Sequence, residues 1–220
     1  LAHNGILFLD EFAQMPKSVT EALRGPLEDR KVTISRLRSK VEFPASFTLV
    51  AAANPCPCGY YGAGDRCTCT PAQRQSYMSR LSGPIMDRID IQLYMEMVSP
   101  EKLVNRVREE SSADVAARVL AARDIQMERF AGTEVFVNAE MTNSMMEHFC
   151  RLSSECRGIM ERMTESMGLS ARAYGRILKI ARTIADLDAV RDGLSQPGEI
   201  TPEHLLEAAG FRFLDRFRGI

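Results

Sequence analysis

The segment Gly5-Ile6-Leu7-Phe8-Leu9-Asp10-Glu11 contains four apolar residues in a row, followed by two adjacent carboxylates. An uninterrupted apolar run of this length predicts a strand that is buried on both faces, as in a parallel sheet. Open α/β sheets bind their ligands at the carboxyl ends of the strands, which is where Asp10 and Glu11 stand. We therefore expect both carboxylates to belong to a ligand-binding site.

A strand that ends in carboxylates is also how a P-loop NTPase builds its Walker B element. There, one Asp holds Mg²⁺ near the triphosphate and a neighbouring group acts on water. The G-x-x-x-x-G-K-[ST] loop that would cradle the phosphates occurs nowhere in the 220 residues. The pair thus predicts an ATPase of which this chain is only a part, and we expect the chain alone to be inactive.

The composition is that of an ordinary globular protein, with 45% hydrophobic and 26% charged residues. No apolar run approaches a membrane helix and no signal peptide is visible, so we expect a cytoplasmic protein. The net charge of −1 argues against a uniformly basic nucleic-acid binder but allows a local basic patch. Six cysteines without a secretory signal favour thiols or metal ligands over disulfides.

Residues 1–99 mix short β-like runs with loops, and from residue 100 onward the pattern is helical. In the first part we expect a helix at 18–24, with Ser18 as its N-cap and Glu21 completing a capping box. We also expect a β-hairpin formed by 32–35 and 41–43, a second buried strand at 47–53 and a third strand at 89–93. In the second part we expect helices at 100–109, 112–130, 139–150, 153–167, 170–187 and 201–209, several with Ser or Thr caps. The chain is thus predicted as α/β (1–99), connecting helices (100–130) and an all-α domain (131–220).

Asn54 stands at the carboxyl end of the second expected strand. An amide beside a Walker B strand can orient the attacking water or contact a γ-phosphate. Taken alone, an Asn before Pro55 is more often a turn residue. Its combination with Asp10 and Glu11 favours the functional interpretation.

Arg88 precedes the third expected strand. An Arg at a subunit edge can reach a neighbour's γ-phosphate as an arginine finger, worth roughly 10³–10⁵ in rate. Taken in isolation, Arg88 fits better as a structural residue paired with Asp87 or Asp90.

Arg172 lies in the first turn of an expected helix, where a cation is unfavourable for the helix dipole. A residue placed against its local preference can have another task, such as binding phosphate. The alternative is a solvated surface Arg, and Arg176 competes for any such role.

Two C-x-C pairs, Cys56/Cys58 and Cys67/Cys69, are separated by eight residues in a loop rich in Gly and Pro. Four thiolates can converge on one tetrahedral Zn²⁺, which would be structural because no coordination position stays open. The C-x-C spacing is tighter than the common one, and four reduced thiols in an exposed loop are the alternative. Cys150 and Cys156 are expected to be buried thiols.

The hairpin tip is basic, with Arg36, Arg38 and Lys40 close together. In a ring ATPase such a hairpin can project into the central pore and follow a nucleic-acid backbone through phosphate contacts. A solvated hairpin is the usual alternative for a charge run.

Taken together, these elements resemble the magnesium-chelatase-like AAA+ ATPases, and within them the competence-related ComM branch. The resemblance is carried by 5–11, the hairpin at 32–43, Ala51-Ala52-Ala53-Asn54-Pro55-Cys56-Pro57-Cys58-Gly59, Leu81-Ser82-Gly83-Pro84-Ile85-Met86-Asp87-Arg88-Ile89-Asp90, and Leu169-Ser170-Ala171-Arg172-Ala173-Tyr174. It implies the C-terminal part of a P-loop AAA+ core followed by a helical lid. It also implies Mg²⁺ binding by Asp10, a general base in Glu11, sensor 1 in Asn54, the arginine finger in Arg88 and sensor 2 in Arg172.

The same resemblance implies a function for the full-length protein. It would be an ATP- and Mg²⁺-dependent ring ATPase, a hexamer by expectation, that acts on branched DNA in recombination or natural transformation. The alternative is a chelatase-type subunit that drives metal insertion into a tetrapyrrole through a partner protein. The basic hairpin and the cysteine loop favour the first.

Overall fold

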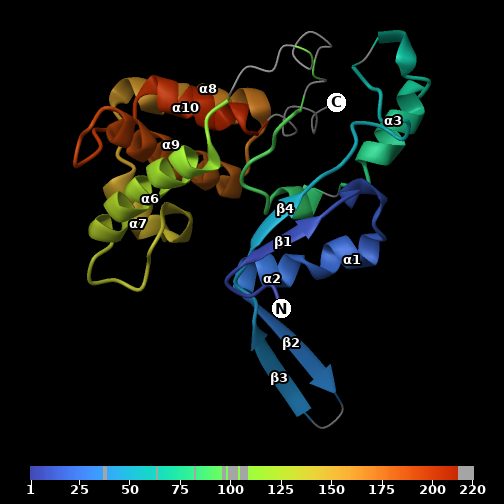
Figure 1. Cartoon of the computed structure of the whole chain (residues 1–220), viewed down its shortest axis with the longest axis horizontal. Helices are drawn as coiled ribbons and strands as arrows, with labels where there is room; N and C mark the ends of the chain where they lie inside the picture. The colour runs from blue at the N-terminus through green and yellow to red at the C-terminus, as the bar shows by residue number, and fades with distance from the viewer. Residues whose placement is uncertain are drawn as a thin grey trace. The chain divides into compact units, whose positions relative to one another are not determined.

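The computed structural model describes residues 1–36, 39–62, 64–81, 83–95, 98, 104 and 109–212. It divides into two compact units, Leu1–Ile89 and Asp90–Ile220. The first unit is mixed α/β and the second is helical (Figure 1). The predicted order of an α/β part before a helical part is thus what the structure has.

The first unit is built on a parallel pair of strands, β1 (Ile6–Leu9) and β4 (Thr48–Ala51), with Leu9 opposite Ala51. The prediction that β1 is buried on both faces is wrong. Ile6 and Phe8 are 68% and 59% exposed, whereas the residues between them are half-buried. The alternation shows that only one face of this sheet is covered within the unit.

The first unit also contains short helical elements: the 3₁₀ turns η1 (Phe12–Gln14) and η2 (Gly64–Arg66), and the helices α1 (Lys17–Ala22), α2 (Arg24–Asp29), α3 (Pro71–Met78) and α4 (Gly83–Met86). Ser18 is not the N-cap of α1, because the helix already begins at Lys17 and Pro16 takes the cap position. Glu21 pairs with Arg24 at 2.7 Å instead of closing a capping box.

Residues 89–93 do not form the expected third strand. The N–H of Gln92 donates to the carbonyl of Phe211 at 2.7 Å, at the end of a helix. Gln92 is buried at this contact, whereas Ile91 and Leu93 are 51% and 63% exposed, so the apolar alternation of this segment does not mark a strand.

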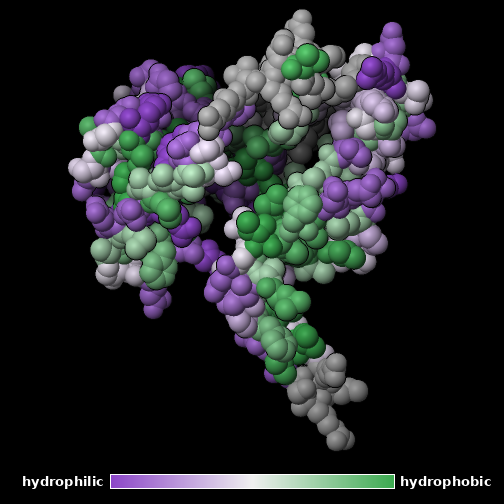
Figure 2. Space-filling model, viewed as in Figure 1, coloured by the Kyte–Doolittle hydropathy of each residue, from purple (hydrophilic) through white to green (hydrophobic). Residues whose placement is uncertain are grey.

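The predicted hairpin is confirmed: β2 (Lys31–Arg36) pairs antiparallel with β3 (Ser39–Pro44) and projects from its unit (Figure 1). Opposite pairs place four apolar side chains on one face, each between 37% and 50% exposed: Val32, Ile34, Val41 and Phe43. Figure 2 shows hydrophobic residues along one side of the hairpin and hydrophilic ones along the other. The hairpin is amphipathic, which the basic tip alone did not indicate.

The second unit contains α6 (Ser112–Arg129), η3 (Asn138–Glu140), α7 (Asn143–Phe149), α8 (Ser154–Met167), α9 (Ala171–Arg191) and α10 (Pro202–Gly210). The side chains of the capping residues each accept a backbone N–H: Ser111, Thr142, Ser153, Ser170 and Thr201. These five predicted helices are confirmed, although α7 starts later than expected because η3 occupies its predicted first turn. The expected helix at 100–109 lies mostly outside the described residues.

The core of this unit is formed by apolar side chains from several of its helices and from the loops between them, among them Phe130, Met160, Ile177 and Leu205. Cys150 and Cys156 belong to it, at 4% and 0% exposure, as predicted. Among the described residues, no helix has both the length and the apolar character needed to cross a membrane.

Candidate functional site

The two carboxylates after β1 leave the sheet in a bend. Glu11 has left-handed backbone angles (φ 50°), and its N–H donates to Oδ1 of Asp10 at 2.8 Å. The chain then returns to the sheet, since the N–H of Phe12 donates to the carbonyl of Ala52 at 2.8 Å. Phe12 is buried while Asp10 and Glu11 are exposed. The bend thus presents two hard oxygen ligands to solvent above a buried anchor, which suits a divalent cation such as Mg²⁺.

Asn54 emerges at the same edge. Ala52 donates its N–H to the carbonyl of Leu9 at 2.9 Å, so the carboxyl ends of β1 and β4 lie side by side. Asn54 follows Ala52 by two residues and is exposed, and its side chain lies beside the turn that follows it. A Cβ built on Gly59 would lie 3.9 Å from its Cγ. The parallel pairing therefore gathers Asp10, Glu11 and Asn54 at one edge of the sheet.

Tyr77 of α3 is a residue near this edge that the sequence did not single out. Its side chain is 4% exposed, and its hydroxyl has no hydrogen-bond partner among the described residues. Burial raises the pKa of Tyr77, and the nearby Cys56 and Glu11 raise it further. An aromatic residue within a polar stretch was the only available signal.

Arg88 is held inside the first unit. Its Nη2 pairs with the carboxylate of Glu28 from α2, and its Nη1 donates to the Pro84 carbonyl at 2.7 Å. The side chain is 9% exposed. In this structure the guanidinium thus has a structural partner, and that partner is 60 residues away in the chain.

The two arginine candidates of α9 differ in their surroundings. Arg172 lies in the first turn, as predicted, two residues after the N-cap Ser170, and is exposed. Arg176, one turn later, forms an ion pair with Asp90 and is half-buried. Of the two, Arg172 is the better placed to receive an anion from outside the unit.

The four cysteines of the loop converge. Their Sγ atoms all lie within 4.8 Å of one another, and Cys56–Cys58, Cys56–Cys67 and Cys58–Cys67 are separated by 3.4, 3.9 and 3.8 Å. A regular tetrahedron with Zn–S bonds of about 2.3 Å has edges of about 3.8 Å. The donor set and its spacing therefore fit a tetrahedral thiophilic metal ion.

The thiols of the cluster differ in acidity. The backbone N–H of Tyr60 lowers the pKa of Cys58 to about 6, whereas desolvation raises the pKa of Cys69 to about 11. At neutral pH a thiolate at Cys58 is therefore favoured beside a protonated Cys69. A thiolate is the form that binds a metal ion, so the cluster is prepared for the first bond.

Helix α3 holds the far side of the cysteine loop. Its N-cap Thr70 follows Cys69 directly and forms a capping box with Gln73. One turn into the helix, Arg74 donates to the Cys69 carbonyl at 2.6 Å and lies over the ring of Tyr61 at 4.8 Å. The loop is thus fixed at both of its cysteine pairs, by β4 on one side and by α3 on the other.

The positive charge of the predicted basic tip is smaller than its sequence indicates, because a carboxylate lies beside it. Lys31 and Lys40 both pair with Glu42, at 3.1 and 3.4 Å, and these contacts lower the pKa of Glu42. Arg38 lies outside the described residues, and Arg36 ends β2. The polar face therefore carries a carboxylate among its cations.

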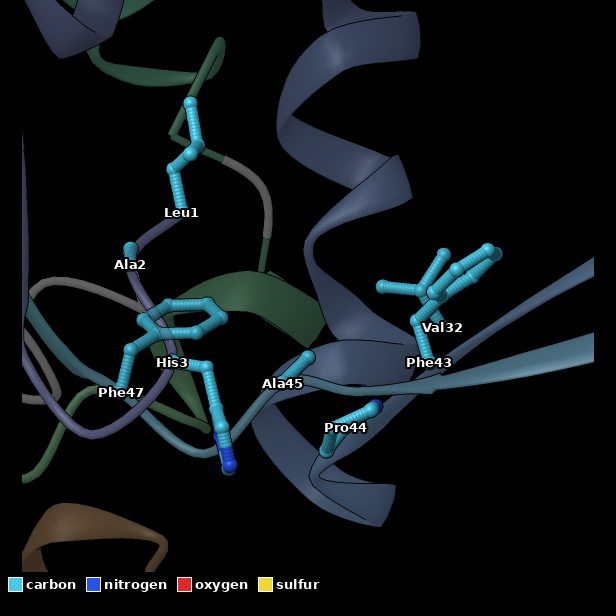
Figure 3. Close-up of a pocket in the computed structure, with 8 residues that line it drawn as sticks. All are labelled: Leu1, Ala2, His3, Val32, Phe43, Pro44, Ala45 and Phe47. Carbon is cyan, nitrogen blue, oxygen red and sulfur yellow. The ribbon is translucent and has the colours of Figure 1, made fainter.

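An apolar hollow of about 500 Å³ lies at the base of the hairpin (Figure 3). It is lined by Leu1, Ala2, His3, Val32, Phe43, Pro44, Ala45 and Phe47. His3 accepts the N–H of Ser46 at 3.1 Å, which accounts for one ring nitrogen by a local contact. We assign this hollow no ligand.

Comparison with known proteins places relatives over almost the whole chain. A family model for magnesium chelatase, subunit ChlI, matches residues 1–103, and one for the C-terminal part of that subunit matches residues 109–212. The uncharacterized protein YifB of Escherichia coli and the competence protein ComM of Haemophilus influenzae are 43% and 42% identical over 217 residues, 98% of this chain. An uncharacterized protein of Mycobacterium bovis, Mb2921c, is 36% identical over 197 residues. The chain spans about 40% of the length of YifB and ComM.

Proposed function

Because this chain belongs to the family of magnesium chelatase subunit ChlI and resembles its ComM branch, we propose that it supplies the Walker B half of a AAA+ ATPase. In this proposal the first unit is part of the P-loop core and the second is the helical lid. The phosphate-binding loop would lie outside these 220 residues, which contain no such motif. The observation that carries the proposal is the single sheet edge shared by Asp10, Glu11 and Asn54.

The residues at that edge have the chemistry that phosphoryl transfer to water needs. Asp10 would bind the Mg²⁺ that bridges the phosphates, and its link to the Glu11 N–H keeps one of its oxygens in place. Glu11 would accept the proton of the attacking water as a general base. Asn54 would orient that water or contact the γ-phosphate.

Two arginines would complete the site from other positions. In a ring, nucleotide lies between subunits, and Arg88 would reach the neighbour's γ-phosphate by exchanging Glu28 for the phosphate. Arg172, at the exposed start of α9, would act as sensor 2. We propose a hexamer as the ring.

We propose DNA as the substrate on which the motor acts, in branch migration or recombination during natural transformation. This is supported by the projecting hairpin with Arg36, Arg38 and Lys40, and by the similarity to a competence protein. Contacts to phosphates would be independent of sequence and sensitive to salt.

We propose Zn²⁺ as the ion of the four-cysteine cluster. The support is the fit of the Sγ separations to a tetrahedron and the thiolate favoured at Cys58. Since all four positions would be filled by protein, the metal would be structural.

A second candidate function is that of a chelatase subunit which drives metal insertion into a tetrapyrrole through a partner protein. The observation in its favour is the description of the two family models that match the chain. It uses the same ATPase site, so only the object of the motor distinguishes the two candidates.

The ATPase proposal is tested by Glu11→Gln in the full-length protein. Loss of the general base should lower turnover by about 10²–10⁴-fold while ATP binding is retained. Asp65→Asn, an exposed carboxylate of η2, is the matched control and should leave both unchanged. Turnover at the level of this control would refute the assignment of Glu11.

DNA binding is tested by two hairpin variants with opposite expected effects. Neutralising Arg36, Arg38 and Lys40 to Gln should weaken DNA binding and flatten its salt dependence, by about 0.9 in the log–log slope per lost phosphate contact. Glu42→Gln should tighten binding, because Lys31 and Lys40 lose their carboxylate partner. No DNA affinity of the full-length protein with ATP would favour the chelatase candidate.

A further inference from the structure

The turn that carries the first cysteine pair is built onto the side chain of Asn54. Cys56 follows Asn54 by two residues, and the chain reverses there, since the N–H of Gly59 donates to the Cys56 carbonyl at 3.0 Å. Gly59 has φ 81°, a conformation that an L side chain rarely adopts. A Cβ added at Gly59 would lie in ordinary van der Waals contact with Cγ and Oδ1 of Asn54, at 3.9 and 4.0 Å, so the turn packs beside this amide.

Within this short turn, the hydrogen bond from Gly59 to Cys56 and the N–H of Tyr60 at Cys58 hold the chain reversal. The two sulfurs that it brings together, from Cys56 and Cys58, are 3.4 Å apart. Two thiols at this distance form at most a weak hydrogen bond, whereas two bonds to one metal ion would lock the turn. Of the other two ligands, Cys69 is held through its carbonyl by Arg74 of α3, and Cys67 precedes it by two residues. A metal ion at the cluster would thus tie the turn beside Asn54 to a helix.

We propose that the metal-loaded cysteine turn is the positioning device for Asn54. The ion fixes the reversal from Cys56 to Gly59, and that reversal holds the Asn54 amide at the catalytic edge of the sheet. Asn54 is the residue that touches the reacting water or phosphate, and Gly59 and the cysteines act through it. This inference rests on the proposed ATPase site and on the proposed Zn²⁺.

The consequence is that metal occupancy controls turnover without controlling nucleotide binding. Asp10 and Glu11 follow β1 and do not depend on the cysteine turn, so Mg²⁺ and ATP should still bind after the ion is lost. An amide displaced by about 1 Å can cost about 10² in rate. Loss of the metal should therefore lower kcat by about that factor and leave the Kd for ATP unchanged.

The experiment uses the full-length protein, with metal content measured by elemental analysis and ATP affinity measured separately from turnover. Cys67→Ser removes a ligand that lies away from Asn54 and should lose the metal, with kcat down by about 10²-fold. Cys156→Ser, a buried thiol outside the cluster, is the matched control and should keep both metal and turnover. Reconstitution of metal-depleted protein with Co²⁺ should give the absorption of a tetrahedral thiolate site and restore turnover.

Two glycine variants separate metal binding from the positioning of Asn54. Gly59→Ala should keep the metal but strain the backbone of the turn beside Asn54, because Gly59 has φ 81°, and should lower kcat. Gly64→Ala imposes a comparable backbone strain (φ 61°) in the same loop but meets nothing within 4 Å, so it should change neither. In an Asn54→Ala background, Gly59→Ala should have no further effect on kcat, because its target is gone.

The outcomes distinguish the presence of the metal site from its role in positioning Asn54. Less than about one metal ion per chain in the protein purified without chelators would overturn the Zn²⁺ proposal itself. Lost metal with normal turnover in Cys67→Ser, or bound metal with normal turnover in Gly59→Ala, would overturn the positioning role and leave the metal site standing. An equal loss in Gly59→Ala and Gly64→Ala, or full additivity with Asn54→Ala, would also overturn it.

Discussion

Removal of Asp186 is the change from which we expect the largest loss of stability. This carboxylate of α9 is completely buried and accepts Nη1 and Nη2 of Arg129 at 2.8 and 2.5 Å. It also accepts Nδ2 of Asn138 at 2.7 Å and lies 3.4 Å from Nε of Arg182. Both guanidinium groups are nearly buried, at 9% and 7% exposure, so two buried cations share one carboxylate.

Asp186→Ala leaves those two guanidinium groups without a counter-charge. Burial already lowers the pKa of Arg182, with Asp186 as the main opposing contact. Removing one partner of a buried ion pair typically costs about 3–5 kcal/mol, because the remaining charge is desolvated and unpaired. With a urea dependence of about 1–3 kcal/mol/M, the unfolding midpoint should fall by at least about 1 M.

The assay is urea unfolding followed by far-ultraviolet circular dichroism, because the long helices belong to the second unit. Asp192→Ala is the control: this carboxylate pairs with Arg191 at 3.0 Å but is 53% exposed, so its loss should cost about 0–1 kcal/mol. Asp186→Asn removes the charge but keeps the side-chain shape, so its loss of stability should be intermediate. It is the variant to measure if Asp186→Ala fails to fold. A loss in Asp186→Ala no greater than in the control would show that this buried carboxylate does not stabilise the second unit.

Two further predictions concern Arg88 and Cys150. Arg88→Met keeps the packed aliphatic part of the side chain but removes its charge. If Arg88 is the arginine finger, turnover should fall by about 10³-fold or more. The free energy of unfolding should change by at most about 1 kcal/mol, because the ion-pair partner Glu28 is half-exposed. Normal turnover with a large stability loss would identify Arg88 as purely structural. Burial raises the pKa of Cys150 to about 11, so iodoacetamide at mildly alkaline pH should leave it unmodified in the native chain and label it after unfolding. Peptide mass spectrometry gives the answer, and rapid labelling of the native chain would contradict it.

The sequence predicted the elements that depend on neighbours along the chain. The apolar runs before Asp10 and Asn54 became a parallel pair, the alternation at 32–43 became a hairpin, and caps such as Ser153 and Ser170 mark where helices begin. These signals are local because a cap or a periodic face involves residues within about one turn or one strand pair. The candidate site at one sheet edge followed from the same rule.

Three features could not be predicted in this way, because each depends on which segments meet in space. Nothing in the run Ile6–Leu9 shows that one of its faces is uncovered within the unit. The partner of Arg88 is Glu28 from a distant helix and not the adjacent Asp87 or Asp90 that the sequence suggested. Likewise, Glu42 forms ion pairs with two lysines of the hairpin and so offsets part of the positive charge that the composition of the hairpin indicates.

By itself, then, the sequence determined the order of elements, the family and the residue types available for chemistry. Only the tertiary structure decided which of them meet: the turn at Gly59 on Asn54, the four sulfurs within 4.8 Å, and Asp186 between two arginines. The physical reason is the range of the interactions. Caps and periodicity act over a few residues of one chain segment, whereas ion pairs and metal sites require groups from distant segments to converge within a few ångströms.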